Sequence, residues 1–226
     1  MQKIKIPKYI AIAAAFVIHG FGIIGILIPT YKEWFIACTP INLILMTALL
    51  FTQQEKIDHK FWIFFAICFF IGFLAELIGV HTGFLFGDYA YGNVLGPKLG
   101  DVPILIGMNW FVVVYCAGCF MEKLHHKVAT ASATIVGPIF VTISIVIDGA
   151  LIATLFDYFM EPVAVSLGYW HWNSLEIPAY NFICWFILSA LLLLAMRKLS
   201  VSTKNHFAIH LLIIQTLFFL LLNLFL

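Results

Sequence analysis

The stretch that decides the fold is FLAELIGVHTGFLFGDYAYGNVLGPKLGDVPILIGMNW, residues 73–110. It begins inside one long apolar segment and ends inside the next, and a connection rich in glycine and aromatic residues lies between them. Glu76 falls within the first segment and the pair Asn109-Trp110 within the second. Because an ionisable group costs roughly 2.5–3.5 kcal/mol at the centre of an inserted helix, such a residue is a candidate for a functional site. The stretch therefore predicts a pocket at one membrane face, with the connection as its lid.

The composition extends this interpretation to the whole chain, which has 226 residues, of which 63% are hydrophobic and 10% charged. Apolar runs of about 20 residues match the ~30 Å hydrocarbon core of a bilayer. We therefore expect an all-α, polytopic membrane protein that forms a single integral-membrane domain over residues 1–226. About seven transmembrane helices are expected, at Tyr9–Ile28, Trp34–Phe51, Phe61–Val80, Pro103–Phe120, Ala133–Phe156, Ala179–Met196 and Phe207–Phe225.

The distribution of Lys and Arg predicts the orientation in the membrane. Most of them fall in the N-terminal head and in the alternate connections that would share its side. By the positive-inside rule the N-terminus is cytoplasmic and the C-terminus outside, in the cell (inner) membrane. The two long connections, 80–102 and 157–178, then share the outer face. A net charge of +1 without a basic patch argues against nucleic acid as a partner.

Counting the helical rise places three polar residues at one depth, in the outer half of the bilayer: Glu76, Asn109 and Asp148. Asp157 and Glu161 are four residues apart and share one face if that helix continues. Asp148 and Asp157 are nine apart, about 180° around a straight helix, so both face one cavity only if the helix kinks. The alternative is that these groups only hydrogen-bond across helices to fix packing.

Several motifs resemble the integral-membrane carotenoid hydratases, of the bisanhydrobacterioruberin hydratase and γ-carotene 1′-hydroxylase types. The first block runs from Glu76 to Gly92 and continues through Leu95-Gly96-Pro97 to Asn109-Trp110. The second block comprises Asp148, then Asp157-x-x-x-Glu161-Pro162, then Leu167-Gly168-Tyr169-Trp170-x-Trp172. The acid-Pro pair is more often Asp-Pro in that family, so Glu161-Pro162 is a mild departure.

The resemblance implies a hydro-lyase that adds water to the C1=C2 double bond of an acyclic ψ end group and gives a tertiary 1-hydroxy carotenoid. This chemistry requires a protonated carboxyl, aromatic faces beside a tertiary cation, and a second carboxylate that orients water. The expected catalytic residues are Glu76, Asp148 and Asp157. The expected substrate-binding residues are Asp88, Tyr89, Tyr91, Asn109, Trp110, Glu161, Trp170 and Trp172.

Among the acids, Glu76 is the expected proton donor, because Gly79 and Gly83 would leave room for a methyl-branched end group. Asp148 is the expected water-orienting carboxylate, since Thr142 and Ser144 make its helix more polar.

No metal or other cofactor is expected. The expected partners are a carotenoid within the bilayer, water, and other enzymes of the carotenoid pathway.

Two other classes of function stay open. A carotenoid end-group cyclase needs the same acid and aromatic residues but excludes water. A carotenoid-binding or transport protein would instead place polar residues along a path through the membrane. The mass of the product separates hydration from cyclisation, because only hydration adds a water molecule.

Overall fold

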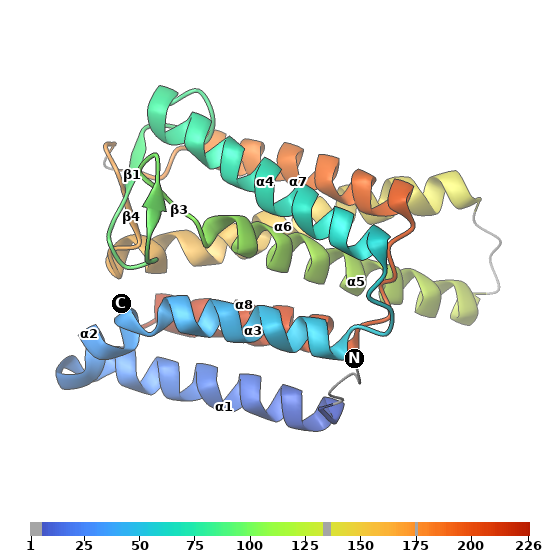
Figure 1. Ribbon diagram of the computed structural model, residues 1–226, viewed down its shortest axis with the longest axis horizontal. Helices are drawn as coiled ribbons and strands as arrows, with labels where there is room; N and C mark the ends of the chain where they lie inside the picture. Colours follow the sequence, from blue (N-terminus) through green and yellow to red (C-terminus); the bar gives the residue numbers. More distant parts are fainter. Residues whose placement is uncertain (1–5, 133–136, 175) are drawn as a thin grey trace.

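The computed structural model describes residues 6–132, 137–174 and 176–226 (Figure 1). Its described part is all-α apart from short strands. The helices are α1 (Lys8–Leu27), α2 (Pro29–Ala37), α3 (Thr39–Gln53), α4 (His59–Thr82), α5 (Ile106–Ser132), α6 (Pro138–Ser166), α7 (Ala179–Leu199) and α8 (His206–Asn223). The strands are β1 (Tyr89–Tyr91), β2 (Lys98–Leu99), β3 (Val102–Pro103) and β4 (Trp170–Trp172). The expected all-α, polytopic class is confirmed.

Five described helices are long and apolar enough to cross a membrane: α1, α4, α6, α7 and α8. The second expected segment is broken into α2 and α3, which meet at an angle of 53° and together would make a sixth span. Each of these two helices has a proline in its first two positions. The N–H groups of the first turn have no partner within the helix, so the missing N–H of proline costs no hydrogen bond there. The fourth expected segment, Pro103–Phe120, corresponds to α5, which is long but carries Asn109 and the pair Glu122-Lys123.

Helix α6 does not end at Phe156, as the sequence predicted, but continues to Ser166 with Pro162 inside it. The polar residues Asp157 and Glu161 were therefore mistaken for the start of a connection. They lie one turn apart within the helix, and both are buried. The expected start of this segment, Ala133, falls outside the described residues, and the described helix begins at Pro138.

The helices form two groups that meet along α5. Helices α4, α5, α6 and α7 make one group, and α1, α3 and α8 lie beneath it in Figure 1. Helix α5 packs against α4 and α6 on one side and α8 on the other. Both long connections, with all four strands, lie at the end of the molecule that also holds α2 and the C-terminus (Figure 1). We call this end the strand end.

The orientation in the membrane can be tested at the C-terminus. We expect a C-terminal reporter that is active only in the cytoplasm to be silent, because the basic connections should face the cytoplasm. The same reporter fused after Lys127, in the last turns of α5, should be active and serves as the control. A bright C-terminal fusion with a silent internal one would reverse the orientation.

Candidate active site

A two-stranded ribbon at the strand end points four aromatic residues inward. Strands β1 and β4 are antiparallel, with Tyr89 opposite Trp172 and Tyr91 opposite Trp170. Because side chains alternate along a strand, the Tyr-x-Tyr and Trp-x-Trp sequences place all four rings on one face. His171, on the other face, is exposed. The ribbon thus presents two phenol hydroxyls and two indole N–H groups to the helices beneath it.

Glu76 accepts hydrogen bonds from three of the surrounding side chains. Its Oε2 accepts from the Tyr89 hydroxyl at 2.5 Å and from the Tyr91 hydroxyl at 2.8 Å, and its Oε1 accepts from Trp110 Nε1 at 2.9 Å. Burial and then the charge of Glu76 raise the pKa of both tyrosines, so they remain protonated donors. Glu76 is 4% exposed and has donors on both oxygens.

Close packing around two glycines positions these donors. A side chain at Gly72 would place its Cβ 2.4 Å from Cγ of Trp110, so only glycine leaves room for that indole. Trp110 also stacks on Trp185, with ring centroids 3.9 Å apart. At Gly79 a Cβ would lie 2.9 Å from the Tyr89 hydroxyl. The space beside Gly79 is therefore filled by the protein itself, and the expectation that it holds a substrate end group was wrong.

The other two buried acids lie on α6. Glu161 Oε2 accepts from Nε1 of Trp170 at 2.9 Å and of Trp172 at 3.0 Å. Asn181 on α7 donates through Nδ2 to Asp157 Oδ2 at 2.9 Å and to Glu161 Oε1 at 3.3 Å. Asn181 thus joins the two acids.

The three acids differ in how many hydrogen bonds their carboxylates accept. Glu76 and Glu161 each accept three hydrogen bonds. Asp157 is 0% exposed and accepts one, from Asn181, while its buried Oδ1 has no partner in the described part of the chain. Donors stabilise an anionic carboxylate, and a carboxyl that lacks them is better accommodated with a proton. The hydrogen bonds therefore distinguish Asp157 as the buried acid that accepts the fewest of them.

All three acids line a cavity of about 20 Å³, together with Asn181, Trp185 and members of the aromatic ribbon. A cavity needs roughly 10–15 Å³ of such volume to hold one water molecule. It also needs two to four polar partners for that water, which the acids and Asn181 supply. The small cavity has the size and the lining of a single-water site.

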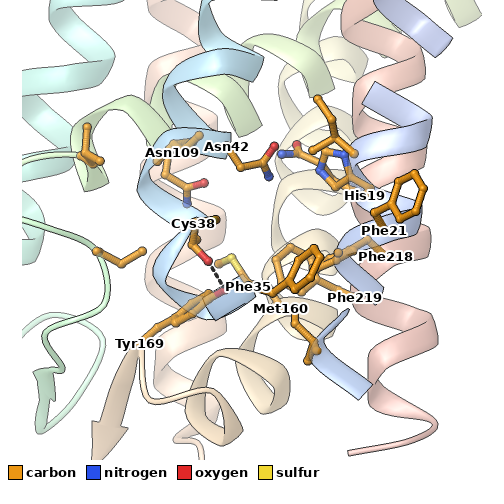
Figure 2. Close-up of a pocket in the computed structure, with 18 of the residues that line it drawn as sticks. His19, Phe21, Phe35, Cys38, Asn42, Asn109, Met160, Tyr169, Phe218 and Phe219 are labelled. Atoms are coloured by element: carbon orange, nitrogen blue, oxygen red, sulfur yellow. Dashed lines mark hydrogen bonds between the residues drawn. The ribbon is translucent and has the colours of Figure 1, made fainter. Parts of the chain in front are cut away.

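A second cavity, of about 450 Å³, shares part of its lining with the first. Figure 2 shows this larger cavity. Ile106, Met160 and Trp170 line both and form the partition between them. The large cavity is mostly apolar, and its lining includes Val17, Phe21 and Trp34, which are 49%, 61% and 64% exposed. Since α1 and α2 would face lipid there, the large cavity opens sideways toward the bilayer.

The structure gathers most of the expected site residues but not all. Glu76, Tyr89, Tyr91, Asp157, Glu161, Trp170 and Trp172 line the small cavity, and Trp110 bonds to Glu76. Asn109 lines the large cavity instead. Asp88 is exposed and accepts from Asn173 Nδ2 at 2.7 Å, so it ties the two long connections together at the surface.

Asp148 is not brought together with Glu76, contrary to the expectation of a common depth. It precedes Asp157 by nine residues, about 13 Å along α6. Its Oδ2 accepts from the Ser144 hydroxyl, and Ser144 also bonds to His125 Nε2 at 2.8 Å. The depth estimate failed because α6 extends ten residues past its expected end, which moves Asp148 toward the basic end of the bundle.

Sequence reasoning missed Asn181, Trp185 and Met160. Asn181 and Trp185 are four apart on α7 and therefore share a face, a pattern that could have marked α7 as part of the site. Met160 lies among apolar residues and gives no such signal. Among the described residues, no group of three His, Cys, Asp or Glu side chains is placed to hold a metal ion.

A small cavity lined by three buried acids, beside a larger and mostly apolar cavity in a bundle of long apolar helices, defines the site as that of a membrane protein. The chain belongs to the family of carotenoid biosynthesis proteins, because the sequence model of that family matches residues 38–226. One relative, the bisanhydrobacterioruberin hydratase of Haloarcula japonica, is 28% identical over 116 residues. These residues make up 50% of this chain and 36% of that protein, so the match covers about a third of the relative's length. No solved structure matches.

Proposed function

We propose that this protein is a carotenoid 1,2-hydratase, which adds water to the C1=C2 bond of an acyclic ψ end group. The observation that carries the proposal is the pair of adjoining cavities, one the size of a water and acidic, the other apolar and open to lipid. Alkene hydration needs these two reactants brought together and an acid between them. The family supports a carotenoid as the substrate, and the relative's name supports hydration.

Asp157 is the proposed general acid. No described residue donates to its Oδ1, whereas both oxygens of Glu76 and of Glu161 accept hydrogen bonds. The end group would approach from the large cavity across the partition, where Met160 is the adaptable side chain. Asp157 transfers its proton to C2, the less substituted carbon, and the π electrons form the new C–H bond. C1 becomes a tertiary cation.

Water in the small cavity then captures the cation. Its oxygen forms a bond to C1, and one of its protons passes to a carboxylate, for which Glu161 is the proposed base. Asn181 bonds to both Glu161 and Asp157, so the proton that returns to Asp157 has a short distance to travel. The sum is one alkene and one water giving one tertiary alcohol, with every carboxyl restored.

Aromatic rings and a fixed anion would stabilise the cation. Trp170 lines both cavities, so its ring lies where the end group would pass from the large cavity to the small one. Cations are attracted to aromatic faces by ~0.5–2 kcal/mol, with the larger values in dry sites. Glu76, held by three donors, supplies negative charge that does not need to reorganise during the reaction. Its proposed role is electrostatic, which differs from the proton donation expected from sequence.

The decisive experiment is product analysis. Membranes that contain the protein are incubated with lycopene or γ-carotene. The products are then separated, and their molecular masses are measured by mass spectrometry. We expect a product heavier than the substrate by one water, with the oxygen derived from labelled solvent water. An isomer of unchanged mass would instead make the protein a cyclase. Unchanged substrate that co-purifies with the protein would favour a binding or transport role.

We expect hydration to be independent of metal ions. The carboxylate oxygens of Glu76 and Glu161 already accept hydrogen bonds from the protein, which leaves few of their lone pairs for a cation. Purified protein treated with a strong chelator should keep its full rate of product formation. Loss of activity that one divalent ion restores would overturn this prediction and would require a metal at the acids.

We also propose that the protein lies in the cell (inner) membrane with its strand end outward. Substrate would come from the lipid phase, and other enzymes of the carotenoid pathway are its proposed neighbours.

A further inference from the structure

The large cavity carries a polar region that the proposed hydration does not use. Its members come from four different helices: His19 on α1, Asn42 on α3, Asn109 on α5 and Gln215 on α8. In Figure 2 the labelled His19, Asn42 and Asn109 lie toward one end of the cavity, with Tyr169 and Met160 toward the other. Polar groups within a membrane bundle are costly unless they have partners. We call these four residues the amide cluster.

His19 offers a hydrogen-bond acceptor to the cavity. Its Nδ1 lies 2.8 Å from the backbone oxygen of Ala15, and since a carbonyl oxygen only accepts, Nδ1 carries the hydrogen. In the neutral ring Nε2 is then an acceptor. The ring is 5% exposed and lies edge-on to Phe218, which fixes its orientation.

Asn42 offers a second acceptor. Its Oδ1 is buried and has no hydrogen-bond partner among the described residues. An unpaired buried acceptor costs about 1–3 kcal/mol, so a ligand that supplies a donor gains this energy on binding. The side-chain amides of Asn109 and Gln215 line the same cavity, and neither makes a hydrogen bond with another described residue. Their NH₂ groups can donate to a ligand oxygen.

We propose that the amide cluster binds the hydroxyl group of a hydroxylated isoprenoid whose hydrocarbon chain occupies the large cavity. A hydroxyl has a single hydrogen to donate, and Asn42 Oδ1, which is buried without a partner among the described residues, is its proposed acceptor. A hydrocarbon and a ketone both lack this donor. The hydroxyl oxygen in turn accepts from an amide NH₂. The apolar remainder of the cavity suits the branched chain next to the hydroxyl.

This site extends beyond the part of the chain that matches the family. The match begins at residue 38, whereas His19, Phe21 and the rest of α1 precede it. Without α1 the cavity would lack one wall and the His19 acceptor. Recognition of a hydroxyl is therefore a property of this chain's first helix together with the shared core.

The isoprenoid identity of the ligand rests on the proposed function, while the preference for a hydroxyl rests on the amide cluster alone. Binding is therefore measured without catalysis, in the Asp157→Asn protein. The two probes are an acyclic carotenoid hydrocarbon and its 1-hydroxy derivative, and the readout is quenching of tryptophan fluorescence by the polyene. We expect the hydroxylated probe to bind about tenfold more tightly, the effect of one to two net hydrogen bonds.

The preference should disappear when the acceptor is removed. In Asn42→Leu the two probes should bind equally, because this change removes the proposed acceptor, whereas His19→Leu keeps that acceptor and should keep a preference for the hydroxylated probe. Gln53→Leu is the matched control, since Gln53 lies at the other end of α3 and bonds to the backbone of Ile6. Structural damage alone would weaken both probes in parallel. Equal binding of the two probes before any change at Asn42, or an unchanged ratio in Asn42→Leu, overturns the proposal.

The source of the hydroxyl follows from turnover measurements. If it belongs to the product, added product inhibits and Asn42→Leu relieves the inhibition. If it belongs to the substrate, Asn42→Leu lowers kcat/KM only for a substrate that already carries a hydroxyl. If the protein discriminates between the probes but does not hydrate, the hydroxyl site stands and the proposed function is wrong. If it hydrates but does not discriminate, the proposed function stands and the hydroxyl site is wrong.

Discussion

Replacing Asp157 with Asn should lower the rate of hydration by about 10²–10⁴-fold, the usual effect of losing a general acid. Asn has the same shape, and its carbonyl oxygen can still accept from Asn181, so the protein should remain folded. It cannot deliver a proton to C2. The rate is measured by product mass in detergent-purified protein, and folding by the thermal unfolding of the same sample.

Asp101→Asn is the matched control for this change. Asp101 is exposed, also at the strand end, and its φ of 63° is a conformation that Asn tolerates well. Asp148→Asn decides between the two acids on α6. If Asp148→Asn abolishes hydration while Asp157→Asn leaves it near normal, Asp157 is not the acid, and Asp148 takes its place as the candidate.

Replacing Glu76 with Leu should destabilise the protein more than any single change elsewhere at the strand end. It would leave the hydroxyls of Tyr89 and Tyr91 and the indole N–H of Trp110 buried without an acceptor. Each orphaned donor costs about 1–3 kcal/mol, and the three act together because they converge on one carboxylate. We expect a large drop in melting temperature, or no accumulation of folded protein.

Glu76→Gln separates stability from charge. Gln keeps one oxygen for these donors, so its melting temperature should lie between those of the parent and of Glu76→Leu. The matched control is Glu33→Leu, which removes an exposed carboxylate from α2 and should change stability little. If Glu76→Leu unfolds at the temperature of the parent, Glu76 does not hold the aromatic ribbon in place.

The division of labour among the acids follows from what surrounds each of them. Glu76 and Glu161 each accept three hydrogen bonds, whereas Asp157 accepts one. This contrast resembles the general arrangement in which one acid gives a proton while another remains ionised. The aromatic ribbon therefore does more than cover the site. Its indoles and phenols hold Glu76 and Glu161 as acceptors, and Asp157 is left as the group with a free oxygen.

Some of the site could be predicted from the sequence because it depends on local order. Glu76 stands out as a carboxylate in an apolar run, and the spacing of Asp157 and Glu161 predicts a shared face once the helix continues. The membrane class follows from the length and apolarity of the runs, since only helices satisfy their own backbone in hydrocarbon. The motif around Glu76 also indicated the family, which the match to residues 38–226 confirms.

The tertiary structure decided what depends on residues far apart in the chain. The pairing of β1 with β4 joins segments about 80 residues apart, and no local pattern sets that register. Asn181 reaches the acids from α7, and His19 on α1 lines the same cavity as Asn42 on α3. The extent of α6 was also decided by packing, because burial of Asp157 and Glu161 among donors allows the helix to continue through polar residues and Pro162. A sequence shows which side chains are unusual, but only the fold shows which of them have partners.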